Sequence, residues 1–276
     1  MKLSVLIPAH DEAAYIGDCL SAVLASDPLP QGMKGEVLVL ANGCSDDTAA
    51  RARDCAVPGG WTLQVVEIKE GGKLNALNIG DEMAGGEIRV YLDADVTVDP
   101  PLLAELAALL SCPEPRYASG RPRVAPALSQ ITRTYARFWQ RLPFFNETAP
   151  GFGLFAMNQA GRARWGDWPD IISDDTFARL SFPPTERHSA KAGYSWPMVE
   201  GFAALVRVRR RQDKGVAEIA ERFPALSSND DKPRLSRADL LKLAIRDPLG
   251  FATYAAVSLA VKSPFFTNKD AWARGR

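Results

Sequence analysis

Two acidic residues separated by one alanine are the first feature of this 276-residue chain that could support chemistry. Asp93 and Asp95 directly follow an apolar run, Arg89–Leu92, that has the composition of a buried strand. Two carboxylates at a strand end can share a divalent cation, Mg²⁺ or Mn²⁺, which keeps open positions for substrate phosphates. The competing interpretation is helix capping, because Thr97 and Pro100 begin a helix nearby. We favour the metal site.

A glycine pair before Lys73 and an acidic pair at positions 174 and 175 are the next candidates. Glycines at a helix start let the backbone approach an anion, and Lys73 adds a positive charge. The spacing is not that of a P-loop, so an ordinary turn with a surface lysine stays open. Asp174 and Asp175 begin a second helix, where they could cap it or supply a general base.

Several arginines lie on neighbouring faces of one basic helix, at positions 207, 209, 210 and 211. Some of them must be solvated, whereas one or two could bind a diphosphate through paired hydrogen bonds. His10 follows the first strand, so we expect it to line a nucleotide pocket. His188 stands beside Arg187, where a surface role is the more common one.

Composition narrows the classes of protein. The formal net charge is zero, with 33 basic and 33 acidic residues, so no global basic excess indicates nucleic-acid binding. The four cysteines form no C-x-x-C pair or zinc spacing, and we expect small buried side chains in a reducing cytoplasm. No run is long enough to span a bilayer; the nearest is Leu249–Val261.

The elements that must position these residues alternate along the first hundred residues. Apolar strand patterns occur at 4–7, 36–40, 63–68 and 88–92, and helical patterns follow the first three of them. This alternation predicts an α/β fold with a mostly parallel sheet covered on both faces. Ligands of such sheets bind at the carboxyl ends of the strands, and the polar clusters fall at those ends.

The second half of the chain is less regular. Apolar residues recur at helical spacing from Leu128 to Leu142, and a basic helix runs from about Ala203 to Arg222. Residues 227–237 are polar and indicate a linker or exposed loop. Ser236 and Asp239 fit a capping box at the start of a final helix, which Pro248 kinks or breaks.

Taken in order, these segments resemble the inverting glycosyltransferase family 2, whose members have the Rossmann-like GT-A fold. The residues that carry the resemblance are, in order, Val5–Glu12, Leu40–Thr48, Glu70–Asn78, Asp93–Asp95, Gly151–Gly153, Ser173–Asp175 and Arg209–Gln212. The match to the family's motifs is specific in the first half and looser in the second. It implies a three-layer sandwich with C-terminal helices.

The resemblance also implies a role for each matching position. The implied donor-binding residues are Pro8, Ala9, Glu12, Asn42, Lys73, Asp93 and Arg211. Asp93 and Asp95 are the implied ligands of the Mg²⁺ or Mn²⁺ cofactor, and Asp175 is the implied catalytic base. The acceptor side is implied for Gly151, Gly153 and Asp174.

Three departures from the family pattern affect these expectations. Ala41-Asn42 replaces a pair of aspartates, which leaves the nucleobase open, and Asp174 replaces a glutamate. Gln212 replaces the tryptophan of processive synthases, and the channel-forming membrane helices are missing. We therefore expect a single-transfer hexosyltransferase acting in polysaccharide or glycolipid assembly, rather than a polymerase.

The implied organisation is a nucleotide-sugar-binding half at 1–97, an acceptor-binding half of the same domain at 98–226, and a linker with a C-terminal helical extension at 227–276. The expected partners are a nucleotide-diphosphate sugar and a carbohydrate or lipid-linked acceptor, with no nucleic acid. We expect a cytoplasmic protein whose last helix contacts the inner membrane surface peripherally or closes the acceptor cleft.

Two other functions fit parts of the sequence. The segment Asp93–Thr97 also matches the D-x-D-x-T nucleophile motif of haloacid dehalogenase-type phosphatases, although that motif normally follows the first strand. A non-catalytic sugar- or membrane-binding module would keep the same fold, but the intact acids argue against it.

Overall fold

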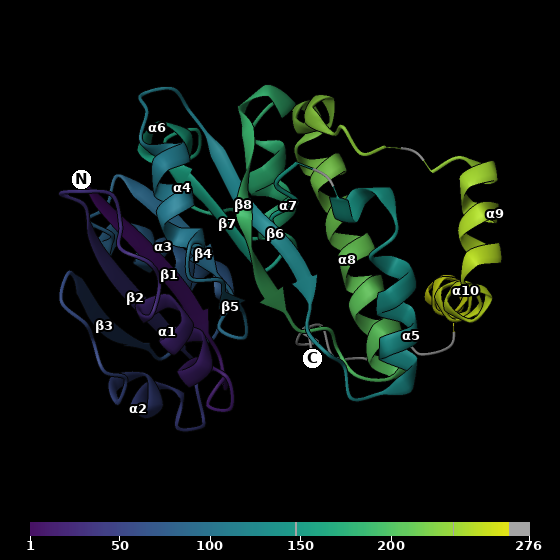
Figure 1. The fold of residues 1–276 in the computed structure, drawn as a ribbon, viewed down its shortest axis with the longest axis horizontal. Helices are drawn as coiled ribbons and strands as arrows, with labels where there is room; N and C mark the ends of the chain where they lie inside the picture. The colour runs from purple at the N-terminus through teal and green to yellow at the C-terminus, as the bar shows by residue number, and fades with distance from the viewer. Residues whose placement is uncertain (147, 234, 265–276) are drawn as a thin grey trace.

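The computed structural model describes residues 1–276 except 147, 234 and 265–276. A single eight-stranded sheet, in the order β3-β2-β1-β4-β7-β6-β8-β5, runs through the molecule, and helices cover both faces (Figure 1). The described residues therefore form the predicted α/β architecture, a three-layer sandwich.

The first half contains the predicted strand and helix alternation. β1 pairs in parallel with both β2 and β4, and β2 pairs in parallel with β3. The bounds are β1 Lys2–Ala9, α1 Ile16–Leu24, β2 Lys34–Asn42, α2 Thr48–Arg53, β3 Trp61–Ile68, α3 Lys73–Met83 and β4 Ile88–Leu92. Because these four strands run the same way, their carboxyl ends lie along one edge, as expected.

The second half adds strands that the sequence pattern did not predict. β7 pairs antiparallel with β4, so it joins the two halves into one sheet, and β6 pairs in parallel with β8. The bounds are β5 Thr97–Val98, α4 Leu102–Leu110, β6 Tyr117–Val124, α5 Gln130–Trp139, β7 Leu154–Asn158, α6 Gln159–Arg162, α7 Asp174–Leu180, β8 Arg187–Trp196, α8 Phe202–Arg222, α9 Arg237–Arg246 and α10 Pro248–Lys262.

Side-chain alternation along the parallel strands builds two cores. Leu3, Val5 and Ile7 pack beneath α1 and α4 on one face, and Leu6 packs with α3 and α7 on the other. Strands buried on both faces read as continuous apolar runs, which is why β1, β2 and β4 were recognisable. A third apolar cluster joins α5, α8 and α10 beside the sheet.

Two expectations are corrected. The apolar pattern expected to face the core from Leu128 begins too early, because Leu128 is 87% exposed and Ile131 is 42% exposed. α5 starts at Gln130 with Ser129 as its N-cap, and its buried face is carried by Tyr135, Phe138 and their neighbours. Of the four cysteines only Cys19 is buried; the other three are partly exposed thiols.

Candidate functional site

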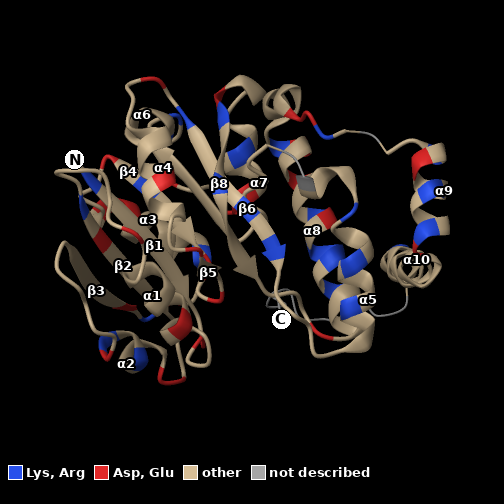
Figure 2. Ribbon diagram, in the orientation of Figure 1, with Lys and Arg blue, Asp and Glu red and all other residues tan. Residues whose placement is uncertain are grey.

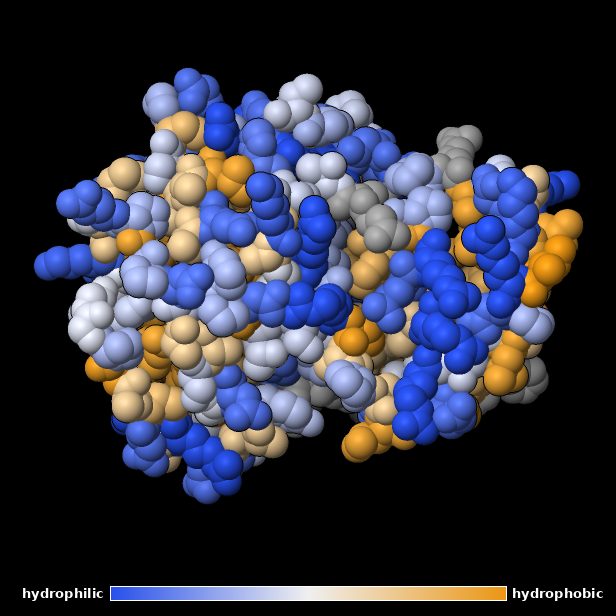
Figure 3. Space-filling view, in the orientation of Figure 1, coloured by the Kyte–Doolittle hydropathy of each residue, from blue (hydrophilic) through white to orange (hydrophobic). Residues whose placement is uncertain are grey.

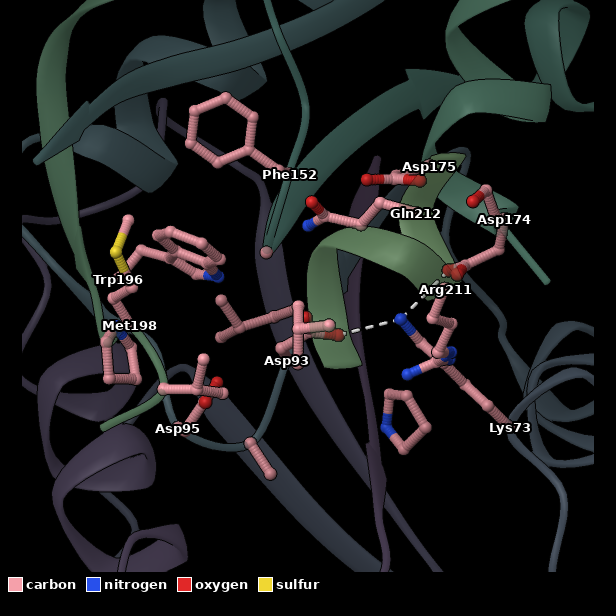
Figure 4. A pocket seen from close by; sticks show the side chains of 18 of the residues that line it. Lys73, Asp93, Asp95, Phe152, Asp174, Asp175, Trp196, Met198, Arg211 and Gln212 are labelled. Atoms are coloured by element: carbon pink, nitrogen blue, oxygen red, sulfur yellow. Dashed lines mark hydrogen bonds and ion pairs between the residues drawn. The ribbon is translucent and has the colours of Figure 1, made fainter. Parts of the chain in front are cut away.

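A cavity of about 430 Å³ opens at the carboxyl ends of β1, β2 and β4 (Figure 4). Ten of the residues expected at the site line it: Pro8, Glu12, Asn42, Lys73, Asp93, Asp95, Gly153, Asp174, Asp175 and Arg211. Ala9 and Gly151 do not line this cavity. The structure thus brings together segments that are up to two hundred residues apart in the chain.

Asp93 and Asp95 lie on the short connection between β4 and β5. The backbone N–H of Asp93 donates to the carbonyl of Gly153 over 2.9 Å, and that of Val96 donates back to Asp93 over 3.1 Å. Gly153 has a φ of +76°, and a Cβ there would meet Trp196 Cδ1 at 2.6 Å. Only glycine therefore allows the backbone at position 153 to come close enough to accept the hydrogen bond from Asp93.

Lys73 links two of the acids. Its Nζ lies 2.8 Å from Asp93 Oδ1 and 2.9 Å from Asp174 Oδ2, as the dashed lines of Figure 4 show. Burial disfavours its charge, but the Asp174 and Asp93 carboxylates outweigh that effect and raise the pKa of Lys73. The ammonium therefore stays charged and connects the end of β4 to the start of α7.

Asp175 sits in the first turn of α7, and its carboxylate faces the cavity (Figure 4). Burial, followed by the negative charge of Asp174, raises the pKa of Asp175 to about 6, although Lys73 acts in the opposite direction. Its Oδ1 also accepts from the backbone N–H of Thr176 over 2.7 Å. At neutral pH this carboxylate is ionised yet has more affinity for a proton than an ordinary aspartate.

Asn42 lines the cavity and uses its amide to hold two neighbouring segments together. Its Nδ2 donates to the carbonyls of Ala9 and Leu40, and its Oδ1 accepts from the Gly72 N–H over 3.0 Å. It is 2% exposed. Asn42 thus holds the glycine turn before Lys73 against the end of β1, and contact with a nucleobase stays a prediction.

The arginines of α8 separate by face. Arg209 and Arg211 line the cavity, and Arg209 Nε lies 3.1 Å from Asp213 Oδ1. Arg210 turns away and donates to the carbonyls of Ala260, Val261 and Ser263 at the end of α10. Arg209 and Arg211 are therefore the arginines of this group that could contact a ligand in the cavity, and Arg210 is not.

An aromatic side of the cavity was missed from the sequence. Trp139 of α5 and Trp196 of β8 stack with ring centroids 5.9 Å apart, and Phe152 packs edge-on against Trp196 at 5.4 Å. Met198 lies beside Trp196 (Figure 4). These residues come from three separate segments, so no local pattern connects them.

A second acidic cluster lies at the margin of this cavity, which Asp11 lines and Cys44 and Asp46 do not. Ligand atoms of Asp11, Cys44 and Asp46 lie within 4.8 Å of one another. Asp46, which precedes the N-cap residue Asp47, accepts from the backbone N–H of Thr48 over 3.0 Å at the start of α2. Asp11 accepts from the Ser45 N–H over 2.6 Å. The two carboxylates thus accept hydrogen bonds from the backbone of the turn before α2, which accounts for their proximity without a metal ion.

The Asp93–Asp95 turn has the chemistry that a hard divalent cation requires. Both residues offer carboxylate oxygens on one connection and both line the cavity, where phosphate oxygens could complete the coordination. Lys73 and Arg211 lie at the same cavity and suit the charge of a diphosphate. The residues present therefore fit a Mg²⁺ or Mn²⁺ ion that is shared with a ligand.

Two curated relatives show similarity to part of the chain. Glycosyltransferase AglE of Haloferax volcanii is 38% identical over 93 residues, which are 34% of this chain and 30% of the relative. An undecaprenyl-phosphate 4-deoxy-4-formamido-L-arabinose transferase of an Enterobacter species is 31% identical over 108 residues, 39% of this chain and 33% of the relative. The chain thus matches about a third of the length of these relatives.

Solved structures share the fold over most of the chain. Mannosyltransferase PcManGT from Pyrobaculum calidifontis, solved with GDP-Man and Mn²⁺, superposes with a TM-score of 0.57 at 20% identity, covering 94% of this chain and 74% of that one. Glucosyl-3-phosphoglycerate synthase from Mycobacterium tuberculosis gives 0.51 at 21% identity, with 81% and 80% covered. These similarities confirm the expected GT-A fold.

The family model described as Glycosyl transferase family 2 matches residues 4–164, more than half of the chain. The matched segment contains the first four strands, the acidic turn and the supporting glycines. It ends before α7 and α8, so the family assignment does not depend on those two helices. This chain therefore belongs to glycosyl transferase family 2.

Proposed function

We propose that this protein is an inverting, divalent-cation-dependent glycosyltransferase that moves one sugar from a nucleotide-diphosphate donor to an acceptor hydroxyl. The observation that carries the proposal is the placement of Asp175. Its carboxylate, with a pKa raised to about 6, faces the cavity that the Asp93–Asp95 turn also lines. Family membership supports a transferase, and the acid in this position supports direct displacement.

Asp175 acts as the general base in the proposed step. It takes the proton from the acceptor hydroxyl as that oxygen forms a bond to the anomeric carbon. The bond from this carbon to the donor phosphate breaks, and its electron pair stays on the nucleoside diphosphate. A single displacement of this kind inverts the anomeric configuration.

The other residues hold the donor and balance its charge. A divalent cation held by Asp93 and Asp95 supplies positive charge to the diphosphate leaving group. Lys73 and Arg211, which line the same cavity, contribute further positive charge. Pro8, Glu12 and Asn42 line its nucleoside side. The donors of structural neighbours include GDP-Man and UDP-GlcNAc, so the nucleobase and the hexose are open.

We further propose a cytoplasmic role in polysaccharide or glycolipid assembly, with a carbohydrate or lipid-linked acceptor. The aromatic side of the cavity supports this acceptor class, because tryptophan rings bind the apolar faces of sugars and isoprenoid chains alike. We assign Gly153 and Asp174, which line the cavity, to the acceptor side, together with Gly151, which does not line it.

A thermal-shift panel of nucleoside diphosphates, each with and without Mn²⁺, tests the donor site. We expect one diphosphate to raise Tm only when Mn²⁺ is present, and Asp95→Ala to remove that shift. Asp54→Ala, which changes an exposed acid directly after α2, is the matched control and should keep the shift. A nucleotide shift that is independent of Mn²⁺ and of Asp95 would contradict the proposed metal site.

The base is tested separately, once the panel has identified a donor. Asp175→Asn should lower transfer by about 10²–10⁴-fold while the Mn²⁺-dependent nucleotide shift persists, because the amide cannot accept the proton. Transfer at a rate near that of the wild type would remove Asp175 from the mechanism and leave the donor site intact.

The phosphatase alternative loses its basis, because the chain belongs to a glycosyltransferase family and its D-x-D-x-T segment follows the fourth strand. The non-catalytic alternative is tested by donor turnover. Release of a nucleoside diphosphate from a nucleotide sugar above background would exclude it.

A further inference from the structure

The outward face of α10 is apolar from Leu249 to Leu259, and Lys262 ends it. One side of the helix packs into the cluster with α5 and α8, chiefly through Phe251, Tyr254 and Val257. The residues exposed on the opposite side follow helical spacing: Leu249, Ala252, Ala256 and Leu259. Leu249 is 61% exposed and Leu259 is 70% exposed. A helix that is apolar all round normally has both faces covered.

α9 extends the same exposed apolar surface. None of its residues is fully buried, and Leu241 and Ile245, one turn apart, are 62% and 73% exposed. A single residue, Asp247, separates α9 from α10 along the chain. Together the two helices form the edge of the molecule farthest from β3 (Figure 1). Figure 3 shows hydrophobic side chains along this outer edge. An exposed patch of this kind marks an interaction site.

Basic side chains flank the patch. Arg237, Lys242 and Arg246 are exposed on α9, against the single acid Asp239, which pairs with Lys242. In Figure 2 the ribbons of α9 and α5 are blue at several positions, which are Lys or Arg. The second acid of this region, Asp247, is buried and pairs with Arg137 of α5 and with Arg141, which follows that helix. The surface around the apolar stripe is therefore positively charged.

The geometry points to a surface that lies on a membrane and does not cross it. In the described part of the chain, no helix combines the length and the apolar character that a membrane crossing requires. The 15 residues of α10 extend about 22 Å, against a hydrocarbon core of about 30 Å. An apolar stripe bordered by arginine and lysine suits the boundary between acyl chains and anionic headgroups.

We propose that α9 and α10 form a docking surface for an anionic phospholipid bilayer, with Leu241, Ile245, Leu249 and Leu259 entering the headgroup boundary. A second copy of this chain is the less favoured occupant. A symmetric contact through this face would place the basic residues of α9 near those of the partner, and like charges repel.

Vesicle co-sedimentation tests the proposal on the full chain. Vesicles of phosphatidylcholine with phosphatidylglycerol should bind the protein more tightly than phosphatidylcholine alone, and added salt should weaken that binding. Leu241→Glu with Ile245→Glu should reduce binding at least about tenfold, because two apolar side chains are lost from the interface. Lys242→Glu with Arg246→Glu should reduce it by about tenfold or more on anionic vesicles.

Matched variants on the far side of the molecule separate this effect from a general change in charge. Val57→Glu changes an exposed apolar residue, and Lys34→Glu with Arg51→Glu reverses two exposed charges; both should bind as the wild type does. Unchanged Tm and circular dichroism establish that each variant is folded. Failure of the wild type to bind anionic vesicles, or equal binding by the α9 and control variants, would overturn the proposal. So would a dimer in sedimentation velocity that Leu241→Glu with Ile245→Glu dissociates.

Discussion

Asp175 is held in an environment that disfavours its own charge. Burial and the neighbouring Asp174 both favour the protonated form, and Lys73 compensates only in part. An acid with such a pKa is a better proton acceptor than a solvated aspartate, and it remains ionised at neutral pH. The same environment has a consequence for stability, because the folded state must contain an unfavourable charge whenever the pH exceeds about 6.

Replacing this charge should therefore stabilise the protein while it abolishes transfer. The pKa of Asp175 is higher in the folded state than in the unfolded state, so its contribution to stability is complete at low pH and is lost as the pH rises through about 6. We expect Asp175→Asn to increase the free energy of unfolding by about 1–3 kcal/mol at pH 8, with a smaller gain at pH 4.

Urea unfolding at the two pH values measures this gain. Asp54→Asn, on the exposed end of α2, is the control and should change stability little at either pH. A loss of stability for Asp175→Asn at pH 8, or a gain that does not depend on pH, would show that the side chain is held by favourable contacts and carries no excess proton affinity.

The sequence identified residues that reach the cavity where a short local motif marks them. The acidic turn at Asp93, the lysine after the glycine pair and the acids of α7 all reach one cavity as expected. The sequence could not identify the distant partners of Asn42, whose amide forms hydrogen bonds with the backbone of two other segments, at Ala9 and Gly72. It also could not separate Arg210 from Arg211, because which face of α8 meets α10 depends on tertiary packing.

Among the elements, the connection before β7 controls the position of the acidic turn. Gly153 precedes β7, accepts a hydrogen bond from Asp93 N–H, and has no room for a side chain between Trp196 and Val96. Its positive φ is also unfavourable for any other residue. The position of Asp93 relative to β7 thus depends on this glycine.

Gly153→Ala should cost about 2–4 kcal/mol of folding free energy, because a strained backbone and a steric clash act together. It should also weaken Mn²⁺-dependent nucleotide binding, since displacement of the Gly153 carbonyl moves Asp93. Chemical denaturation and the thermal-shift panel measure the two effects. Gly166→Ala, at a position where a Cβ meets nothing within 4 Å, is the control. Equal stability of the two variants would refute the role assigned to Gly153.

The strands of the second half explain why sequence patterns stop being informative there. β6 contains Gly120, Pro122 and two arginines, and β8 is largely polar, so neither shows a strand pattern. β7 is fully buried but has only five residues. Their partners are distant in the chain: β7 pairs with β4, and β8 pairs with both β6 and β5. Such strands are specified by the sheet they join, not by their own periodicity.

At the scale of the whole molecule, residues 1–97 and 98–226, expected as two halves of the same domain, contribute strands to one sheet. β4 and β7 pair within one sheet, and Lys73 links the end of β4 to α7 across the cavity. The division at residue 227 is closer to a physical boundary. α9 and α10 lie beyond the sheet and contact the rest mainly through α5 and α8.

Asp247 is the polar centre of that attachment. Its carboxylate, 7% exposed, accepts two hydrogen bonds from Arg137, at 2.8 and 2.7 Å, and one from Arg141 at 3.2 Å. Its Oδ1 also accepts from the Gly250 N–H over 3.0 Å and so caps α10. The hydrogen bonds from Arg137 lower the pKa of Asp247, so its stabilising effect is present above pH 4 and declines in stronger acid.

Asp247→Ala should therefore loosen the C-terminal helices without unfolding the sheet. Loss of the cap and of the pairing with α5 should cost about 1–3 kcal/mol, concentrated in the last two helices. Hydrogen exchange followed by mass spectrometry should show faster exchange in peptides from residues 237–262 and unchanged exchange in β1–β4. Asp239→Ala, an exposed acid on α9, should leave the exchange of α10 as it is in the wild type. Faster exchange throughout the sheet would mean that α9 and α10 unfold together with the sheet. The surface proposed to bind the membrane would then belong to the same cooperative unit as the cavity.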